Sequence, residues 1–252
     1  MAVTFKAGKG VRPLVDEKDL APFLTEVSVA AERDPLDVTT FLDNDRNYIV
    51  GLGNVTASLD GFFAASTTAV DDLANYMDSA FGGSTKMIVT IDMQGTTGGR
   101  ALMLTGDHTA YDIDSKADDV VGLSVDVQGS NGYAGGVMLR PLSAATSTGS
   151  NTGVITPGTT SAGGSTGGGV AHLHVTAEST ANAVFKVQHS TSGSTWADLI
   201  TFATVTSGPT FQRSTVAGTV KERVRSTIST FSTSTGTESV TAAVAFSRRA
   251  RT

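Results

Sequence analysis

Alternation of apolar and polar residues with a period of two is the feature that most constrains this chain. The segment NVTASLDGFF, residues 54–63, shows it clearly: Val55, Ala57 and Leu59 fall on one face, and polar side chains fall on the other. Successive side chains of a β-strand point to opposite faces, so this pattern predicts a half-buried strand. What the polar face contacts is the question that the rest of the sequence has to answer.

The N-terminal segment 1–142 is predicted to hold several such strands and one helix. The helix spans Ala69–Phe81, because Thr68 and Asp71 form a capping box, apolar residues recur at helical spacing, and Gly82 and Gly83 end it. The predicted strands are Tyr48–Phe63, Lys86–Met93 paired with Arg100–Gly106 across QGTTGG, Val120–Gln128, and Gly136–Leu142. A lone amphipathic helix among antiparallel strands should cover one face or end of a sheet or barrel, so a mainly β fold is predicted.

The C-terminal segment 170–252 is predicted to be an all-β sandwich. Turn signals such as SGSTW and TSGPT recur at short, regular intervals, and we find no helical pattern. The predicted strands are Val170–Ala177, Ala183–His189, Trp196–Phe202, Thr210–Lys221, Glu222–Phe231 and Val240–Arg248. Ser plus Thr rises from 21 in segment 1–142 to 41 in segment 143–252. We therefore predict three parts: a β domain at 1–142, a Gly/Ser/Thr-rich linker at 143–169, and a C-terminal sandwich at 170–252.

Composition excludes several classes of function. Segment 1–142 carries 10 Lys/Arg against 20 Asp/Glu, and segment 143–252 carries 8 against 4. An acidic first domain is unsuited to binding nucleic acid, because such binding relies on basic side chains that neutralise the phosphates. The chain has no cysteine, which excludes disulfides and thiolate chemistry. It also has no apolar run of membrane-spanning length, and MAVTFKAGKGVRPL lacks the apolar core of a secretory signal.

Several residues are compatible with chemistry, but each has a simpler interpretation. His172 and His174 share a strand face and could form half of a metal site with His189; we expect instead a solvated polar face. His108 beside Asp107 could belong to a Ser-His-Asp triad, but no nucleophile elbow of the form G-x-S-x-G, which would support one, accompanies it. The segment DIDSKADD lacks the Gly and Glu of a calcium loop, and Trp196 is expected in the core rather than as a sugar platform. The sequence therefore predicts no catalytic residues, no metal and no cofactor.

One tract resembles a known family. In LDVTTFLDNDRNYIVGLGNVTASLDGFF, residues 36–63, an Asp-x-Thr-Thr-Phe element is followed by a charged turn, a strand containing Gly-Leu, and a strand of alternating small polar residues. Together with the capped helix that follows, this resembles the tail tube (major tail) proteins of long-tailed bacteriophages. The segment from HLHVTAEST to AVAFSRR resembles sandwich domains appended to some phage tail proteins.

The resemblance implies an antiparallel β-barrel or sandwich with one flanking α-helix, and a structural virion protein rather than an enzyme. It would assemble as hexameric rings stacked into the phage tail tube, with genomic DNA crossing the lumen during ejection without specific binding. Its partners would be further copies of itself, the tape measure protein and other tail proteins, with no membrane involved. Its location would be the virion, after assembly in the host cytoplasm. The alternative function is a virion-anchored binding module whose C-terminal sandwich adheres to host-surface glycans.

This implied role suggests what the polar strand faces contact. A channel that passes DNA should repel phosphates with carboxylates and present hydrated hydroxyls. The lumen-facing candidates are Thr56, Ser58, Asp60, Thr90, Asp92, Ser124, Asp126 and Gln128. The alternative for each of them is that it faces external solvent or a neighbouring subunit. Contacts between subunits are expected from an apolar N-terminal arm that docks on a neighbour. A basic strand face is expected either to be solvated or to contact an acidic neighbouring subunit. The candidates for these contacts are Val11, Leu14, Leu20, Phe23, Leu24, Lys221, Arg223 and Arg225.

Overall fold

The structure is a computed structural model that describes residues 8–63, 86–116, 118, 120–150, 165–178, 182–206, 208–232 and 238–248. In these ranges the chain is built from antiparallel β-strands, with one short 3-10 helix at Gly8–Gly10. The predicted mainly β fold class is therefore confirmed. The predicted helix Ala69–Phe81 lies outside the described residues.

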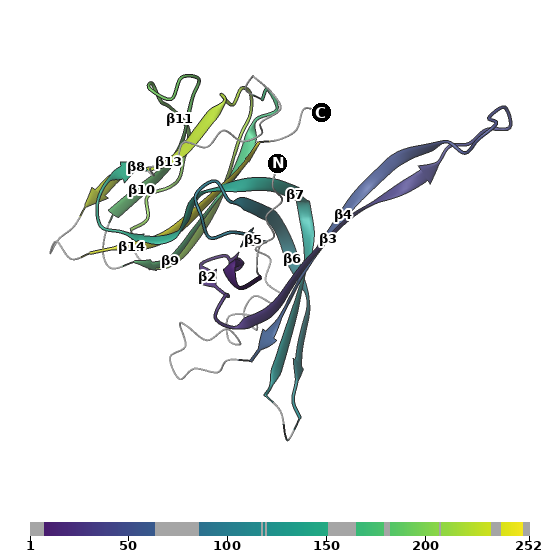
Figure 1. Ribbon diagram of the computed structural model, residues 1–252, viewed down its shortest axis with the longest axis horizontal. Coiled ribbons are helices and arrows are strands. Elements are labelled where there is room, and N and C mark those ends of the chain that lie inside the picture. Colours follow the sequence, from purple (N-terminus) through teal and green to yellow (C-terminus); the bar gives the residue numbers. More distant parts are fainter. Residues whose placement is uncertain are drawn as a thin grey trace, which may run out of the picture. The chain divides into compact units, whose positions relative to one another are not determined.

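The strands form two sheets (Figure 1). Their bounds are β1 Arg12–Val15, β2 Lys18–Asp19, β3 Leu24–Asp37, β4 Tyr48–Phe62, β5 Met87–Asp92, β6 Arg100–Asp114, β7 Gly122–Ala145, β8 Gly149–Ser150, β9 Gly169–Glu178, β10 Asn182–Ser190, β11 Ala197–Thr201, β12 Thr210–Val216, β13 Arg223–Ser232 and β14 Val240–Arg248. The larger sheet has the order β12-β9-β14-β7-β6-β5-β1-β2, with β3 and β4 added beside β7. The smaller sheet has the order β11-β10-β13-β8.

The chain divides into two compact units. Unit 1 comprises Met1–Pro22, Ile88–Met103 and Ala134–Thr252, and unit 2 comprises Phe23–Met87 and Leu104–Tyr133. The long strands β6 and β7 belong to both units. Unit 2 carries 16 Asp/Glu and 4 Lys/Arg, whereas unit 1 carries 8 Asp/Glu and 14 Lys/Arg. The two units therefore have formal charges of opposite sign.

The units group residues differently from the predicted domains. β14 pairs with β7 from Val240↔Ala145 to Phe246↔Val137, so the end of the predicted first domain shares a sheet with C-terminal strands. The predicted linker begins in strand structure, because β7 runs to Ala145 and β8 covers Gly149–Ser150. Residues 151–164 lie outside the described residues. Independent folding of 1–142 and 170–252 stays a prediction.

Unit 1 has an apolar core between the two sheets. Strand β9 contributes Ala171, Leu173 and Val175 to it, and β10 of the smaller sheet contributes Phe185 and Val187. All five side chains are buried, because period-2 alternation directs them to the same side of their strands. The hydrophobic effect of this layer holds the two sheets of the sandwich together.

The other face of β9 and β14 is also covered, which the sequence did not predict. Val170, Ala243 and Ala245 pack there with Leu14 of β1 and Met103 of β6. Every described residue from Gly169 to Val175 is buried as a result. The expectation of a solvated face at His172 and His174 was therefore wrong, because the N-terminal strand of the same chain covers it.

A core truncation tests this arrangement. Phe185→Ala should lower the free energy of unfolding of unit 1 by about 3–5 kcal/mol, because it removes a ring that is fully buried between the sheets. Urea unfolding followed by the fluorescence of Trp196, the single tryptophan, measures this. Phe231→Ala is the matched control, since Phe231 only borders the core and should cost clearly less. Equal losses for the two variants would contradict the assigned core.

Candidate functional site: a polar sheet face and an exposed hairpin

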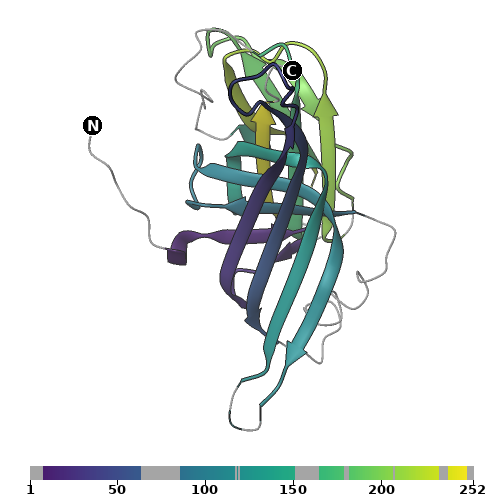
Figure 2. The same ribbon diagram turned by 90° about the vertical axis from the view of Figure 1, so that its right-hand side faces the viewer.

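The candidate site lies on the sheet of unit 2, in which β3, β4, β7 and β6 lie side by side (Figure 2). Strands β4 and β7 pair from Thr56↔Gln128 to Phe62↔Gly122. Residues at odd positions from Val55 to Leu59 and from Leu123 to Val127 are buried, and those at even positions between them are half-buried. The buried residues are Val55, Ala57, Leu59, Leu123, Val125 and Val127. The predicted alternation therefore produces one apolar and one polar face.

Three cross-strand pairs form the polar face. Ser58 Oγ donates to Asp126 Oδ1 and Ser124 Oγ donates to Asp60 Oδ1, each at 2.5 Å. Thr56 Oγ1 lies 3.4 Å from Gln128 Oε1. The members of each pair are directly opposite in the strand register, where side chains on one face come closest. The structure thus brings together six of the eight lumen-facing candidates, and we call these six residues the polar face.

Further carboxylates border the polar face. Glu26 of β3 is directly opposite Asp60 in the register and is exposed. A groove at the end of the sheet has Asp60, Asp112 and Asp114 in its wall, together with Thr25 and Ser124. Because unit 2 has a large excess of acidic residues, this end of the sheet presents negative charge with hydroxyl groups between the carboxylates.

Thr90 and Asp92 are not part of the polar face. Both lie in β5, where all six side chains are buried, with exposed fractions of 0% and 1%. Asp92 Oδ1 instead accepts hydrogen bonds from the N–H groups of Gln94 and Gly95, at 2.9 and 2.8 Å, and so caps the turn to β6. Their assignment as lumen-facing residues is wrong, because packing within unit 1 covers the second face of β5.

The N-terminal contact candidates divide in a similar way. Leu14 and Leu20 are buried in unit 1 at 0% and 1% exposure, so they belong to the subunit's own core and cannot dock on a neighbour. The remaining candidates are half-buried, and their role in subunit contacts stays a prediction. These are Val11, Phe23, Leu24, Lys221, Arg223 and Arg225.

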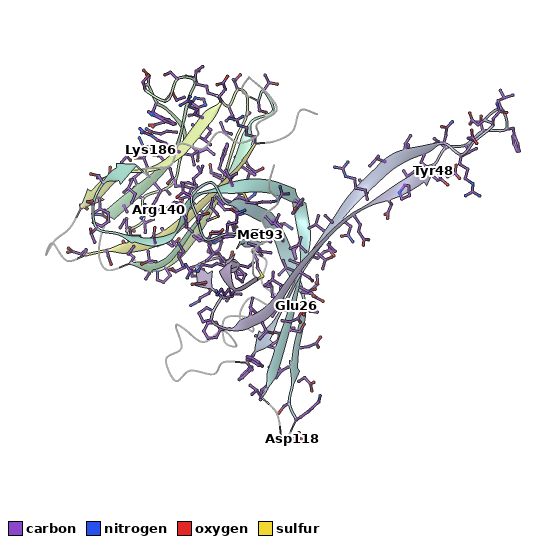
Figure 3. The ribbon with its side chains drawn as sticks, viewed as in Figure 1. Glu26, Tyr48, Met93, Asp118, Arg140 and Lys186 are labelled. Atoms are coloured by element: carbon purple, nitrogen blue, oxygen red, sulfur yellow. The ribbon has the colours of Figure 1, made fainter. Side chains whose placement is uncertain are left out.

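An exposed hairpin is the feature that sequence reasoning missed. β3 and β4 pair as far as Asp37↔Tyr48, whereas β7 covers β4 only from Thr56 onward. The distal part is therefore a two-stranded ribbon with side chains standing out on both sides (Figures 1 and 3). Its large apolar residues are exposed: Leu36, Val38, Phe41, Leu42, Tyr48, Ile49, Val50 and Leu52. Exposed apolar surface of this extent is uncommon on free monomers and is typical of interaction sites.

Polar side chains order the tip of this hairpin. Asp37 Oδ1 accepts hydrogen bonds from the N–H and Oγ1 of Thr39, at 2.9 and 2.5 Å. Asp43 Oδ2 accepts from the N–H and Oγ1 of Thr40, at 2.7 and 3.0 Å. These bonds lower the pKa of both carboxyl groups, chiefly through the Thr39 hydroxyl for Asp37 and the Thr40 N–H for Asp43. The tip therefore presents Phe41 and Leu42 from a defined turn.

Both outer edges of the unit 2 sheet have open hydrogen-bonding positions within the described part of the chain. β3 pairs there with one strand, β4. β6 runs from Arg100 to Asp114, whereas its neighbour β5 covers only Met87–Asp92, so the distal part of β6 extends beyond β5. Open strand edges are templates for pairing with another chain.

Comparisons with known proteins give structural neighbours only. No family model matches the chain, and no curated protein matches it. A chain of the virion of a native gene transfer agent particle aligns at 13% identity and a TM-score of 0.42, over 52% of this chain and 98% of that one. The SPP1 tail tube protein aligns at 12% identity and a TM-score of 0.42, over 51% of this chain and 77% of that one. The SPP1 Dit protein aligns at 12% identity and a TM-score of 0.36, over 94% of this chain and 98% of that one.

The alternative chemical sites are not assembled. Asp107 binds Lys86 Nζ at 2.8 Å, while His108 follows it on the opposite face of β6, so they do not form a catalytic dyad. His189 lies on β10 and accepts a hydrogen bond from the Lys221 N–H, away from His172 and His174 of β9. Among the described residues, no group of three or more His, Asp or Glu side chains is placed to hold a metal ion.

Trp196 is also placed differently from the prediction. A register shift at Val187/Gln188 changes the alternation in β11, so Ile200 points to the core while Trp196 is half-buried outside it. The Arg225 guanidinium lies 4.2 Å from the centroid of the Trp196 ring and covers one face of it. The Trp196 ring therefore has a partner from its own chain on one face, and the glycan-binding alternative stays a prediction.

None of the described helical residues forms a helix long and apolar enough to cross a membrane.

Proposed function

We propose that this chain is a structural protein of a phage tail that assembles with copies of itself into stacked rings around a channel. The polar face of unit 2 carries the proposal: six polar side chains are aligned on one side of a long sheet whose other side is apolar. Its acidic character suits a wall past which DNA moves, because carboxylates repel phosphates and hydroxyls hold water.

Ring closure follows from the open edges. The β3 edge of one subunit would pair with the distal β6 edge of the next, which extends the sheet around the ring. The resemblance of residues 36–63 to tail tube proteins supports six subunits per ring. The polar face would then line the lumen, with genomic DNA passing through it during ejection without specific binding.

Stacking of rings follows from the hairpin. Phe41, Leu42 and Leu52 are almost completely exposed and therefore contribute nothing to the core of their own subunit. In the assembly they would be buried on a subunit of the adjacent ring, and the hydrophobic effect would drive that contact. The tape measure protein and other tail proteins would be the remaining partners, and the virion would be the location.

Electron microscopy of the purified full-length protein tests this function. We expect single rings at low concentration and tubes at high concentration, because assembly by repeated contacts depends on subunit concentration. Analytical ultracentrifugation of the same samples measures the masses of the species. A protein that stays monomeric up to millimolar concentration would contradict the proposal. It would leave the glycan-binding module as the alternative, to be examined by binding to host-surface glycans.

A further inference from the structure

A buried polar network connects the turn between β1 and β2 with β5 and β9 in unit 1. Its members are Asp16 in the turn, Thr90 of β5, and His172 and His174 of β9. All four are buried, with exposed fractions of 4%, 0%, 2% and 0%. The proposed assembly assigns no role to this network.

Hydrogen-bond geometry determines where each proton lies. His174 Nδ1 is 2.6 Å from the Asp16 carbonyl oxygen, which can only accept, so Nδ1 carries the proton. In the neutral ring Nε2 is then an acceptor, and the Thr90 hydroxyl at 2.8 Å must donate to it. The Thr90 oxygen is also 3.0 Å from His172 Nδ1. Since its single proton is already used, His172 Nδ1 must be the donor of that bond.

Asp16 fastens the turn at three points. Its N–H donates to the Ile88 carbonyl at 2.9 Å, its Oδ1 accepts from the Ile88 N–H at 2.6 Å, and its own carbonyl accepts from His174. Asp16 adopts a left-handed backbone conformation with φ of 50°, which aspartate tolerates better than most residues. The position of the turn therefore depends on contacts with both β5 and β9.

The surroundings of the two histidines disfavour additional positive charge. Arg213 of β12 is directly opposite His172 in the register, and β14 places only Ala243 and Ala245 opposite the two histidines. The β1–β2 hairpin brings Lys18, and it also brings Arg12, which is already paired with Asp19 at 3.5 Å. On β5, the carboxylate of Asp92 caps its own turn.

We propose that the Asp16–His174–Thr90–His172 network is an acid-sensitive latch that holds the β1–β2 turn on β9 at neutral pH and releases it when the histidines bind protons. One added proton on His174 would make Nε2 a donor, so the Thr90 oxygen would accept from both rings and the Thr90 proton would lose its acceptor in the network. A second proton would place two cationic rings with their centroids 6.1 Å apart in a buried site. The network thus provides an acceptor for each of these protons only in the neutral state.

Burial determines the direction of the pH dependence. Desolvation lowers the pKa of His174 to about 4, and desolvation, His174 and Arg213 lower the pKa of His172 well below its ordinary value. When the latch opens, both histidines regain ordinary values near 6.5, so the open state binds more protons than the closed state. The closed state is therefore fully favoured above about pH 6.5 and loses stability as the pH falls toward 4.

Amide hydrogen exchange of the full-length protein between pH 7 and pH 4.5 tests the latch. After correction for intrinsic exchange rates, protection of residues 12–19 and 87–92 should fall below pH 6.5 by about tenfold per pH unit for one histidine and about a hundredfold for both. Protection in β10 and β13 of the same unit should change much less. Constant protection of 12–19, or an equal loss throughout unit 1, would overturn the proposal.

Two variants and one spectroscopic measurement sharpen the test. His174→Asn keeps a donor toward the Asp16 carbonyl but cannot titrate. The loss of protection per pH unit should therefore fall from about a hundredfold, the value for two histidines, to about tenfold, the value for one. His189→Gln is the matched control and should keep the wild-type dependence.

If His174→Asn does not fold, nitrogen-15 NMR of the unmodified protein decides: both His172 and His174 should be Nδ1–H tautomers at pH 7. An Nε2–H tautomer at His174 would overturn the assigned proton order. None of these results depends on ring assembly.

Discussion

Replacing Phe41 and Leu42 together by serine should give a folded protein that forms no tubes. Both side chains are exposed at the tip of the β3–β4 hairpin, so the subunit's own fold loses no buried area. In the proposed stack each would become buried, which contributes about 1.5–3 kcal/mol per side chain. The affinity of each stacking contact should therefore fall by about two to four orders of magnitude. Sedimentation velocity and electron microscopy measure the loss of large species.

Two controls separate assembly from folding. Val120→Ser removes an exposed apolar side chain of the same unit that lies between β6 and β7, outside the hairpin and outside both strand edges, and should leave tubes intact. Circular dichroism during heating should show the same unfolding midpoint for the hairpin double variant and the wild type. Normal tubes from the hairpin variant would contradict the role of the hairpin, and a lower midpoint would contradict its separation from the core.

Replacing Asp60 and Asp126 by lysine should slow the passage of DNA in a virion complemented with this variant. In the proposed lumen, each ring would then hold a circle of lysines that exchange counterions with phosphates. Ejection should slow most at low salt and recover at high salt, because this binding weakens steeply with ionic strength. Time-resolved DNA release at several salt concentrations measures the effect.

The controls for DNA passage vary charge and position separately. Asp60→Asn with Asp126→Asn removes the charge but keeps an acceptor for Ser124 and Ser58, so ejection should stay near normal. Glu17→Lys with Glu222→Lys makes the same total charge change in unit 1 and should have no effect. Normal ejection with lysine at 60 and 126 would place the polar face outside the channel, and failed assembly would place it at subunit contacts.

Local sequence patterns predicted most strands because each pattern is contained within its own segment. Val55, Ala57 and Leu59 are buried in β4 as their alternation requires, and the QGTTGG turn joins β5 and β6 with positive φ at Gly95 and Gly98. The predicted break between Val120–Gln128 and Gly136–Leu142 is absent, because one strand, β7, continues through both. β3 was not predicted, although Val27 and Val29 alternate with polar neighbours in it.

Which face of a strand is covered depended on residues far away in the chain. Thr90 and Asp92 carry the same alternation as Ser58 and Asp60, but only the first two are buried, because β5 is enclosed within unit 1. In the same way, β9 has a second buried face because Leu14 packs on that side of its sheet. An alternating pattern states that two faces differ; it does not state that the polar one meets water.

The sequence by itself determined that this chain is mainly β, that one polar face includes Ser58, Asp60, Ser124 and Asp126, and that acidic residues are concentrated in segment 1–142. These properties are local or additive, so one strand or one count reveals them. Only the tertiary structure decided that Phe41 and Leu42 at the hairpin tip are exposed and belong to no core. It also decided that Asp16, Thr90 and two histidines share one buried network. The reason is physical: burial and hydrogen bonding depend on which distant segments pack together, and those pairings leave no periodic signal in the segments themselves.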